Sequence, residues 1–310
     1  MYLSQLKIEG FKSYTEPVEV NFDQKISVII GSNGVGKSNA LDAVIWALGE
    51  NNFLSLRCEG YNDLIFSGSN KAYATSEADV QLTFEENDEI FSIARTINES
   101  GSEKFLVSGQ SVSDLNQYRE ALRDLGLGNA RINLVRQDEL TNFFSWGSND
   151  RKRYVENFIT TQESLQEVNE RFAEYLDALM PGTSGQLFYD QSADCVDIEV
   201  VFPDKGRRRG IQLSGGERAS TALALKLALF HTRPSPMYMF DEIEASLDWT
   251  HGHNMQDLLK KLSQDRQLII VTHFQSTIRM ANTVIRPDGS SWLKFHFIMD
   301  ERLFKIYKCC

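Results

Sequence analysis

Apolar and polar residues alternate along the opening part of the chain. Residues 2–9 and 18–22 both follow this two-residue period, which predicts two half-buried strands. Residues 26–30 are apolar almost throughout, and such a run is typical of a strand that is buried on both faces. A central strand is therefore predicted over 26–30.

The same periods predict the remaining elements. Strands are expected over 80–84, 90–95, 104–107, 132–135, 186–189, 196–202, 236–240 and 267–271, and helices over 39–48, 114–125, 151–159, 214–230 and 251–262. Asn87-Asp88 predicts a hairpin turn, so the early strands should form an antiparallel β subdomain. Buried strands alternate with helices elsewhere, which indicates an α/β fold with a largely parallel central sheet.

A heptad-like stripe marks an expected boundary between two lobes. Its apolar residues recur at steps of three and four: Leu165, Val168, Phe172, Leu176 and Leu179. The stripe spans a few turns and ends at Pro181-Gly182, which predicts a short coiled-coil neck over 161–180. An N-terminal lobe over 1–160 and a C-terminal lobe over 181–310 are then expected to form one composite domain.

Composition narrows the class of protein. Of 310 residues, 42% are hydrophobic and 24% charged, and the net charge of -11 argues against a polycation that binds nucleic acid through its overall charge, but not against a local basic patch. The four cysteines show neither metal-ligand spacing nor a disulfide framework, which favours a reducing interior. The N-terminus has no apolar signal core, and Lys226 interrupts the most apolar helix, so a cytosolic or nuclear protein without a membrane span is expected.

A glycine-rich loop follows the predicted central strand. Gly31-Ser32-Asn33-Gly34-Val35-Gly36-Lys37-Ser38 fits G-x-x-x-x-G-K-[ST] at every fixed position, and a helix is predicted after it. The amides of such a loop cradle the phosphates of ATP, Lys37 supplies a positive charge, and the Ser38 hydroxyl binds Mg²⁺. The alternative is a glycine-rich turn formed by chance, which the flanking strand and helix disfavour.

Two acids follow the predicted strand over 236–240. Asp241 is expected beside the Mg²⁺ at Ser38, and Glu242 is placed to act as general base on the attacking water. An acidic pair at a strand end is otherwise often a solvated turn. The glycine loop makes the catalytic interpretation the stronger one.

A second anion-binding pattern lies far from the first. Leu213-Ser214-Gly215-Gly216-Glu217 opens a helix, with Ser214 as a candidate N-cap and glycines that allow close backbone approach. Because the chain already has a phosphate loop, this pentad is expected to serve the nucleotide of another subunit. The alternative is a capped helix that binds no ligand.

Four further candidates rest on weaker local grounds. Gln137 follows a strand and is expected to complete the Mg²⁺ shell or hold the lytic water, although surface glutamines are common there. His273 is a candidate γ-phosphate contact, although a lone histidine is more often structural. Ala245-Ser246-Leu247-Asp248 is expected at a dimer interface, and Arg57 near nucleotide or DNA, or else as a surface cation.

In this order, the motifs resemble the ATP-binding-cassette (ABC) class and, within it, the structural-maintenance-of-chromosomes (SMC) family, from residue 1 to about 286. The segments that carry the resemblance are Ile8 to Tyr14, Ser38-Asn39, Leu56-Arg57, Asp63 to Ser69, Gln137, Leu213 to Glu217 and Asp241 to Asp248. The resemblance implies an ABC-type P-loop ATPase head. It adds Lys12, Ser13, Asn39, Arg57 and Asp63 to the expected ATP-binding residues.

The resemblance also implies a mechanism and partners. Two heads are expected to sandwich two ATPs, each site using one head's glycine loop and the other head's pentad. ATP engages the heads and hydrolysis releases them, which drives DNA entrapment, loop extrusion or cohesion. A kleisin subunit and DNA are further expected partners, and Arg151-Lys152-Arg153 and Arg207-Arg208-Arg209 are either DNA contacts or solvated faces.

Two features depart from the SMC pattern. SMC proteins carry a long coil and a hinge between their lobes, whereas here only the short stripe is present, which favours a head whose coil has been removed over a truncated relative. The alternation in 291–310 predicts edge strands, and family precedent makes this lobe the kleisin dock. Residues 234–238 are similar to cohesin heads; the expected location is the nucleus if the protein is eukaryotic, and the cytoplasm or nucleoid if it is prokaryotic.

Three other functions compete with the SMC interpretation. One is a DNA-repair ATPase of the Rad50 or RecF kind, against which the acidic motif after residue 240 and the Arg57 loop argue. Another is a nucleotide-gated scaffold with negligible turnover, which the presence of both catalytic acids disfavours. A transporter ATPase subunit is disfavoured by the split lobes and by Glu217 in the pentad.

Overall fold

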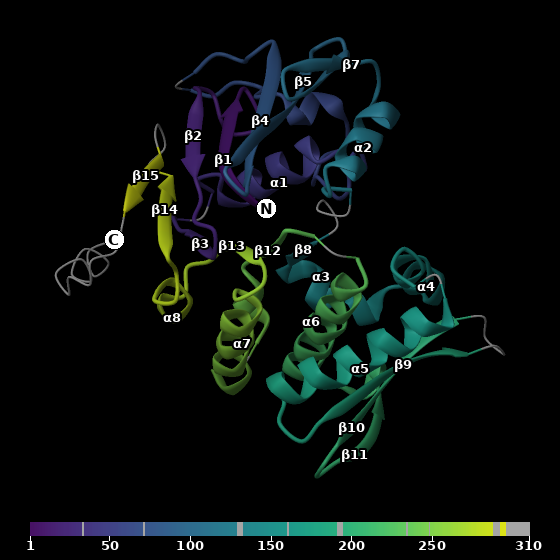
Figure 1. Cartoon of the computed structure of the whole chain (residues 1–310). Helices are drawn as coiled ribbons and strands as arrows, with labels where there is room; N and C mark the ends of the chain where they lie inside the picture. Colours follow the sequence, from purple (N-terminus) through teal and green to yellow (C-terminus); the bar gives the residue numbers. More distant parts are fainter. Residues whose placement is uncertain are drawn as a thin grey trace.

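The computed structural model describes residues 1–32, 34–70, 72–128, 133–159, 161–190, 195–233, 235–247, 249–287 and 292–295. Its central sheet has the order β15-β14-β3-β13-β12-β8 (Figure 1). The strands are β3 (Ile26–Ile29), β8 (Leu134–Arg136), β12 (Met237–Asp241), β13 (Gln267–Val271), β14 (Thr283–Pro287) and β15 (Trp292–Phe295). All neighbours are parallel except β15, which pairs antiparallel with β14 at the edge. The predicted parallel α/β fold is confirmed.

A second sheet is antiparallel and comes from the first part of the chain. It has the order β2-β1-β4-β5-β6-β7. Its strands are β1 (Tyr2–Glu9), β2 (Val18–Asn21), β4 (Glu77–Glu86), β5 (Glu89–Asn98), β6 (Glu103–Val107) and β7 (Gln110–Val112). Asn87 and Asp88 have φ values of 50° and 69°, which is the left-handed geometry of a tight hairpin turn. The predicted antiparallel subdomain and its turn are therefore confirmed.

Helix α1 (Lys37–Ala47) lies between the two sheets (Figure 1). Alternate side chains of each central strand face opposite ways, as a strand requires. Met237 and Met239 belong to the core that surrounds α1, whereas Tyr238 and Phe240 belong to the core on the other face. Both faces of the central sheet are thus covered, which explains why its strands are apolar throughout.

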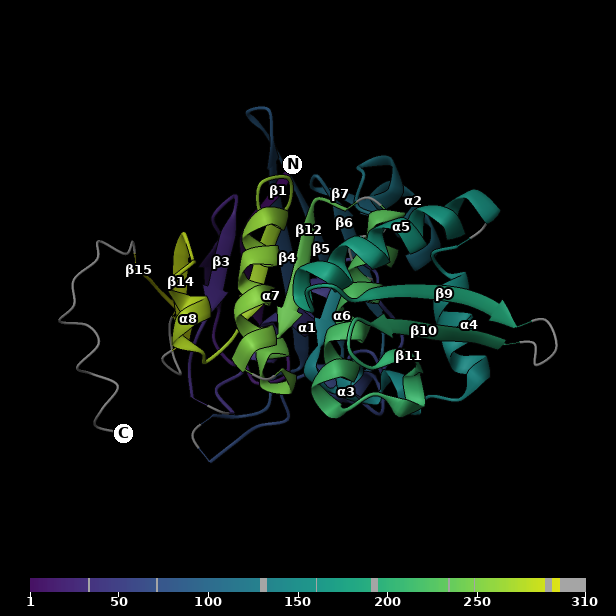
Figure 2. The ribbon, with the colours of Figure 1, turned by 90° about the horizontal axis from the view of Figure 1, so that it is seen from below.

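The opposite face of the central sheet is covered by helices and a small third sheet (Figure 2). The helices are α5 (Gln162–Leu179), α6 (Gly215–His231) and α7 (Trp249–Leu262), and the sheet has the order β11-β10-β9. Its strands are β9 (Ser184–Asp190), β10 (Cys195–Phe202) and β11 (Gly206–Arg209).

The predicted stripe forms one side of α5. Val168, Phe172, Leu176 and Leu179 are fully buried in the same core as α6 and β9. These contacts are those of an amphipathic helix within the head, so a coiled-coil stub is not clearly shown. The neck over 161–180 and the lobe boundaries on either side of it stay predictions.

Short elements complete the described chain. They are α2 (Leu115–Asp124), α3 (Gln137–Asn142), α4 (Ser148–Glu156) and α8 (Gln275–Ile278), with 3-10 turns at η1 (Tyr61–Leu64), η3 (Phe143–Ser145), η4 (Gly210–Gln212) and η5 (Ile243–Ser246). None of the helices in the described ranges has the length and apolar character needed to cross a membrane. The tail beyond residue 295 lies outside the described residues, and only β15 of the edge strands expected there is described.

Candidate nucleotide site

The glycine loop joins β3 to α1, as the sequence predicts. Gly36, with φ +94°, is the N-cap of α1, and a Cβ atom there would lie 2.5 Å from the Ser13 hydroxyl. The Tyr14 hydroxyl donates a hydrogen bond to the Gly36 carbonyl at 2.9 Å. The hydrogen bond fixes the loop where it enters the helix, and the close approach of Ser13 leaves no room for a side chain at Gly36. The first amides of α1 have no partner within the helix, so they are free to bind an anion.

Lys37 is buried at the start of α1, with 5% of its side chain exposed. Its ammonium group donates hydrogen bonds to the carbonyls of Gly31 and Ser32, at 2.9 and 3.1 Å. The same group lies 3.5 Å from the Glu242 carboxylate. The lysine side chain therefore folds back onto the glycine loop, and its ammonium group lies beside the predicted phosphate site.

Ser38 and Asp241 meet although 203 residues separate them. The Ser38 hydroxyl donates to an Asp241 carboxylate oxygen at 2.8 Å. Burial raises the pKa of Asp241, and the hydrogen bond from Ser38 and the charge of Arg136 oppose this only in part. A bound cation would stabilise the charged carboxylate, and a hydroxyl with a carboxylate is the oxygen donor set that Mg²⁺ prefers. The residues present thus fit a magnesium ion.

Glu242 adopts a left-handed backbone conformation at the end of β12, with φ 52°. Its backbone amide donates to the Val271 carbonyl at 2.9 Å, which holds the turn against β13. The imidazole of His273 lies 3.8 Å from the Glu242 carboxylate. The Glu242 carboxylate is therefore close to both Lys37 and His273, and a strained backbone conformation such as that of Glu242 is typical of functional sites.

Gln137 lies at the same edge of the central sheet. It begins α3 directly after Arg136, and Arg136 is the partner of Asp241 in the parallel pairing of β8 with β12. Because the carboxyl ends of parallel strands meet at one edge, Gln137 and Asp241 leave their strands side by side. The structure therefore brings the expected Mg²⁺ residues into one region.

Asp42 is a site residue that the sequence interpretation missed. Its fully buried carboxylate binds three cations: Lys12 at 2.6 Å, Arg57 at 2.6 Å and Arg136 at 2.7 Å. Burial alone would raise the pKa of Asp42, but these three charges outweigh burial and lower it. The available signal was a single acid at an inner position of the apolar helix after the glycine loop.

Asp42 also explains where Arg57 lies. The guanidinium donates to Asp42 and, at 3.1 Å, to the Asn39 side chain. Asn39 in turn donates to the Ser13 hydroxyl at 2.9 Å. Arg57, Lys12, Ser13 and Asn39 therefore form one polar cluster beside the start of α1.

Asp63 has a different position from these residues. Its carboxylate accepts hydrogen bonds from the backbone amides of Glu59 and Gly60, at 2.7 and 3.2 Å. These bonds hold the turn that follows Arg57. A direct contact between Asp63 and nucleotide stays a prediction.

The pentad opens α6, as predicted. Ser214 is the N-cap, and its backbone amide donates to the Glu217 carboxylate at 2.7 Å. Lys205 binds the same carboxylate at 2.7 Å. Leu213 is buried, whereas Ser214 and Gly215 are exposed, which leaves the free amides of the helix N-terminus open to an anion.

The expected interface segment begins in η5. Ser246 and Leu247 are half-buried, and Leu247 packs against the core below the central sheet. Asp248 lies outside the described residues, as does Asn33 of the glycine loop. The roles assigned to both stay predictions.

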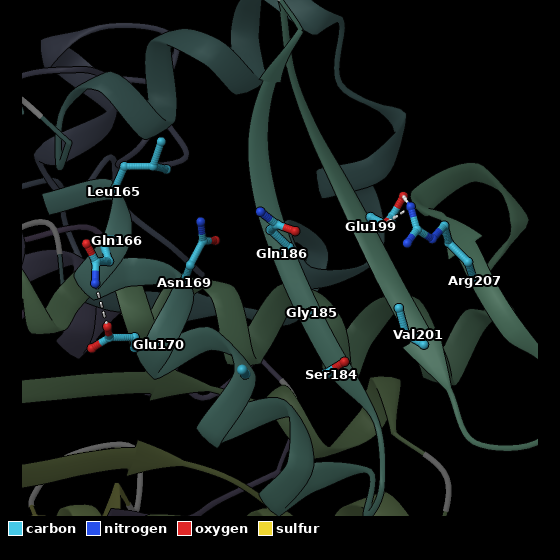
Figure 3. A pocket seen from close by; sticks show the side chains of 11 residues that line it. Leu165, Gln166, Asn169, Glu170, Ser184, Gly185, Gln186, Glu199, Val201 and Arg207 are labelled. Atoms are coloured by element: carbon cyan, nitrogen blue, oxygen red, sulfur yellow. Dashed lines mark hydrogen bonds and ion pairs between the residues drawn. The ribbon is translucent and has the colours of Figure 1, made fainter. Parts of the chain in front are cut away.

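A groove of about 730 Å³ lies elsewhere, between α5 and the outer face of the third sheet (Figure 3). The side chain of Asn169 on α5 accepts a hydrogen bond from the Leu187 amide at 2.7 Å and donates one to the Leu187 carbonyl at 3.0 Å. These two bonds hold the edge strand β9 against α5. Glu199 and Arg207 form an ion pair on the far wall. The described residues that line this groove include none of the predicted nucleotide residues.

The order and geometry of these motifs agree with a comparison against protein families. The model of the RecF/RecN/SMC N terminal domain matches residues 2–288. The chain belongs to this family. The predicted identity as an SMC-type ATPase head is confirmed by this match together with the relatives and head structures that follow.

Similar sequences are chromosome partition proteins called Smc. The protein of Halothermothrix orenii is 35% identical over 147 residues, which are 45% of this chain and 12% of that protein. The protein of Bacillus subtilis is 32% identical over 163 residues, which are 50% of this chain and 14% of that protein. The SMC head described here therefore corresponds to a small part of these relatives.

Solved SMC heads have the same fold over nearly the whole chain. An Smc head bound to the C-winged helix domain of ScpA has a TM-score of 0.81 and 27% identity, with 96% of this chain and 99% of that chain covered. The SMC head domain from Thermotoga maritima has a TM-score of 0.69 and 29% identity, with the same coverage.

Proposed function

We propose that this SMC head binds ATP with Mg²⁺ and hydrolyses it to ADP and phosphate. The observation that carries the proposal is the meeting of Ser38 with Asp241 and of Lys37 with Glu242 at the carboxyl edge of one sheet. The loop amides and Lys37 hold the phosphates, and Ser38, Asp241 and Gln137 hold Mg²⁺, which neutralises charge that develops on the phosphates. Glu242 accepts a proton from the attacking water, with His273 beside the γ-phosphate.

We infer that each active site is completed by a second head. The pentad offers free amides at an exposed helix N-terminus, and its described contacts are local, to Gly210, Lys205 and Arg218. A terminus with this character suits a phosphate that another molecule presents. Two heads, identical or different, then bind two ATPs between them, with the segment that includes Ser246 at their interface.

The wider role follows from the relatives. Chromosome partition is the role that their names state, and we propose that ATP-driven engagement and release of heads act on DNA in the same way, through entrapment, loop extrusion or cohesion. A kleisin is the proposed bridging partner, because a similar head was solved with a ScpA domain. Bacterial relatives favour the cytoplasm or nucleoid as the location.

A basic groove supports DNA as a partner. Arg119, Arg123 and Arg233 line a groove of about 650 Å³ together with Glu120 and other residues of α2. Arg123 keeps only a loose ion pair with Glu120, at 3.6 Å, whereas Arg207 of the third sheet lies 3.1 Å from Glu199. Three arginines around one groove concentrate positive charge that a phosphate backbone would bind, so we propose the α2 groove as the DNA contact.

Two variants test the proposed ATPase. Glu242→Gln should lower phosphate release about 10²–10⁴-fold, the usual contribution of a general base, while ATP-dependent dimers persist. Ser214→Arg should leave ATP binding intact but abolish both dimers and hydrolysis. Dimers are measured by light scattering with ATP and either EDTA or Mg²⁺. Normal hydrolysis by Glu242→Gln would contradict the assignment.

A further inference from the structure

Lys226 is a buried charge that the proposed active site does not use. It lies in the middle of α6 with 1% of its side chain exposed, among leucines and alanines that are fully buried. A lysine in such surroundings is costly unless it is paired. Its role therefore depends on its partners.

The partners of Lys226 come from two other helices. Its ammonium group donates to the Glu139 carboxylate on α3, and it lies 5.1 Å from the centre of the Tyr154 ring on α4. Burial alone would lower the pKa of Lys226, but the Glu139 carboxylate outweighs burial and raises it. By their contact the two groups form an ion pair, which joins α6 to α3 with a directional hydrogen bond.

The two partners of this contact belong to elements that carry different predicted site residues. Glu139 is two residues after Gln137, in the helix that continues from β8 of the central sheet. Lys226 is twelve residues after Ser214 in one uninterrupted helix, which places it about 18 Å along the axis from the pentad. A small tilt of α6 at Lys226 would therefore displace Ser214.

We propose that Lys226 is a positioning residue, which through Glu139 fixes the orientation of α6 and so places Ser214 correctly for the nucleotide of the partner head. This inference rests on the proposed shared active site. The apolar neighbours of α6 stabilise its packing, but hydrophobic burial is not directional. The ion pair is directional, and it fixes the orientation of α6 relative to the sheet that holds Gln137 and Asp241. Lys226 thus acts in the partner's site and not in its own.

Lys226→Met is the variant of choice. It leaves Glu139 unpaired, but that carboxylate is 32% exposed and can be hydrated, and Met fills much of the same volume. Phosphate release should fall about 10²-fold, the effect of a misplacement of about 1 Å. ATP binding in EDTA should not change. If Lys226→Met does not fold, Glu139→Leu/Lys226→Met, which leaves no unpaired charge, replaces it in every step.

Mixed dimers of two variants show whether Lys226 affects the active site of the partner head or the active site of its own head. The reference mixture is Glu242→Gln with Ser214→Arg, in which one site has an intact loop and an intact pentad, so hydrolysis should return. Failure of this mixture alone would refute the shared site. A mixture of Lys226→Met with Glu242→Gln should regain hydrolysis, because the intact loop of the first variant meets the intact pentad of the second. A mixture of Lys226→Met with Ser214→Arg should not, because neither variant offers an intact pentad.

Other results would overturn the inference while the reference mixture still works. Full hydrolysis by Lys226→Met alone would show that the pair positions nothing. Recovery with Ser214→Arg would show that Lys226 acts on Gln137 of its own chain. Absence of recovery with either partner would show a general defect of the head.

Discussion

Asp42 lies 2.7 Å from Arg136 across 94 residues of sequence. One residue belongs to the helix after the glycine loop, and the other directly precedes Gln137. Lys12 and Arg57 bind the same buried carboxylate. The Asp42 carboxylate therefore links helix α1 to Arg136, which precedes the expected Mg²⁺ ligand Gln137, and to the loop that carries Arg57.

Asp42→Asn should destabilise the fold by about 3–5 kcal/mol, the usual result of removing one partner from a buried ionic cluster. The reason is that Lys12 and Arg136, with 9% and 7% of their side chains exposed, would lose their counter-charge without gaining water. Urea denaturation near neutral pH without nucleotide measures the effect. Arg57→Ala is the control, and it should cost less because the arginine side chain is 42% exposed.

The pH dependence gives the same prediction a second test. The pKa of Asp42 is lowered in the folded protein, so its contribution to stability is present above the unfolded pKa and is lost as the pH falls through the folded pKa. The gap between wild type and Asp42→Asn should therefore be constant at neutral pH and close below about pH 4. A gap that persists in acid would rule out an electrostatic cause.

Much of the fold could be predicted because its signals are local. The apolar runs at 26–30, 236–240 and 267–271 predict buried parallel strands, and the structure has them as β3, β12 and β13. The glycine loop needs a strand before it and a helix after it, and both are present. Motif spacing also predicted which strand ends would meet, since Asp241 and Ser38 lie at the same sheet edge.

The remaining features depend on partners distant in sequence. The polar strand β11 has no apolar period, because it is held by pairing with β10 and by ion pairs of Arg207 and Arg209. The Asp42 cluster and the Lys226–Glu139 pair each join groups more than 80 residues apart. Single-sequence patterns show such residues only as interruptions of an apolar helix.

Glu244→Gln should stabilise the head near neutral pH. Burial raises the pKa of Glu244, and neither of its carboxylate oxygens has a hydrogen-bond partner among the described residues. Because the folded pKa is raised, the stability associated with this group is present at low pH and is lost as the pH rises above its ordinary value of 4.5. Near neutral pH the charged form of this buried carboxylate therefore carries a free-energy penalty, and the uncharged amide of glutamine removes that penalty.

Thermal unfolding across pH measures the Glu244 effect. The variant should exceed wild type near neutral pH and match it near pH 4. Glu99→Gln is the control at an exposed position, where a change within about 0.5 kcal/mol at every pH is expected. A Glu244→Gln variant less stable than wild type near neutral pH would mean that the buried carboxylate is charged and paired.

Ser38→Ala should separate ATP binding from Mg²⁺ binding. It removes the hydroxyl that meets Asp241 at 2.8 Å but leaves Lys37 and the loop amides in place. The Mg²⁺ concentration for half-maximal phosphate release should rise about 10–100-fold or more, the range for supporting groups around a metal, while ATP binding in EDTA stays the same. An unchanged Mg²⁺ requirement would place the metal elsewhere.

Arg123→Ala should weaken DNA binding if the α2 groove contacts the phosphate backbone. The side chain is 65% exposed and lies 3.6 Å from Glu120, so its removal alters little of the core. Anisotropy titrations with labelled duplex at several salt concentrations should show lower affinity and a slope of log K against log salt reduced by about 1. Arg207→Ala is the matched control, because that arginine is 73% exposed but more closely paired, at 3.1 Å from Glu199, and its slope should equal that of wild type. A loss of affinity and slope in Arg207→Ala but not in Arg123→Ala would move the DNA contact to the third sheet.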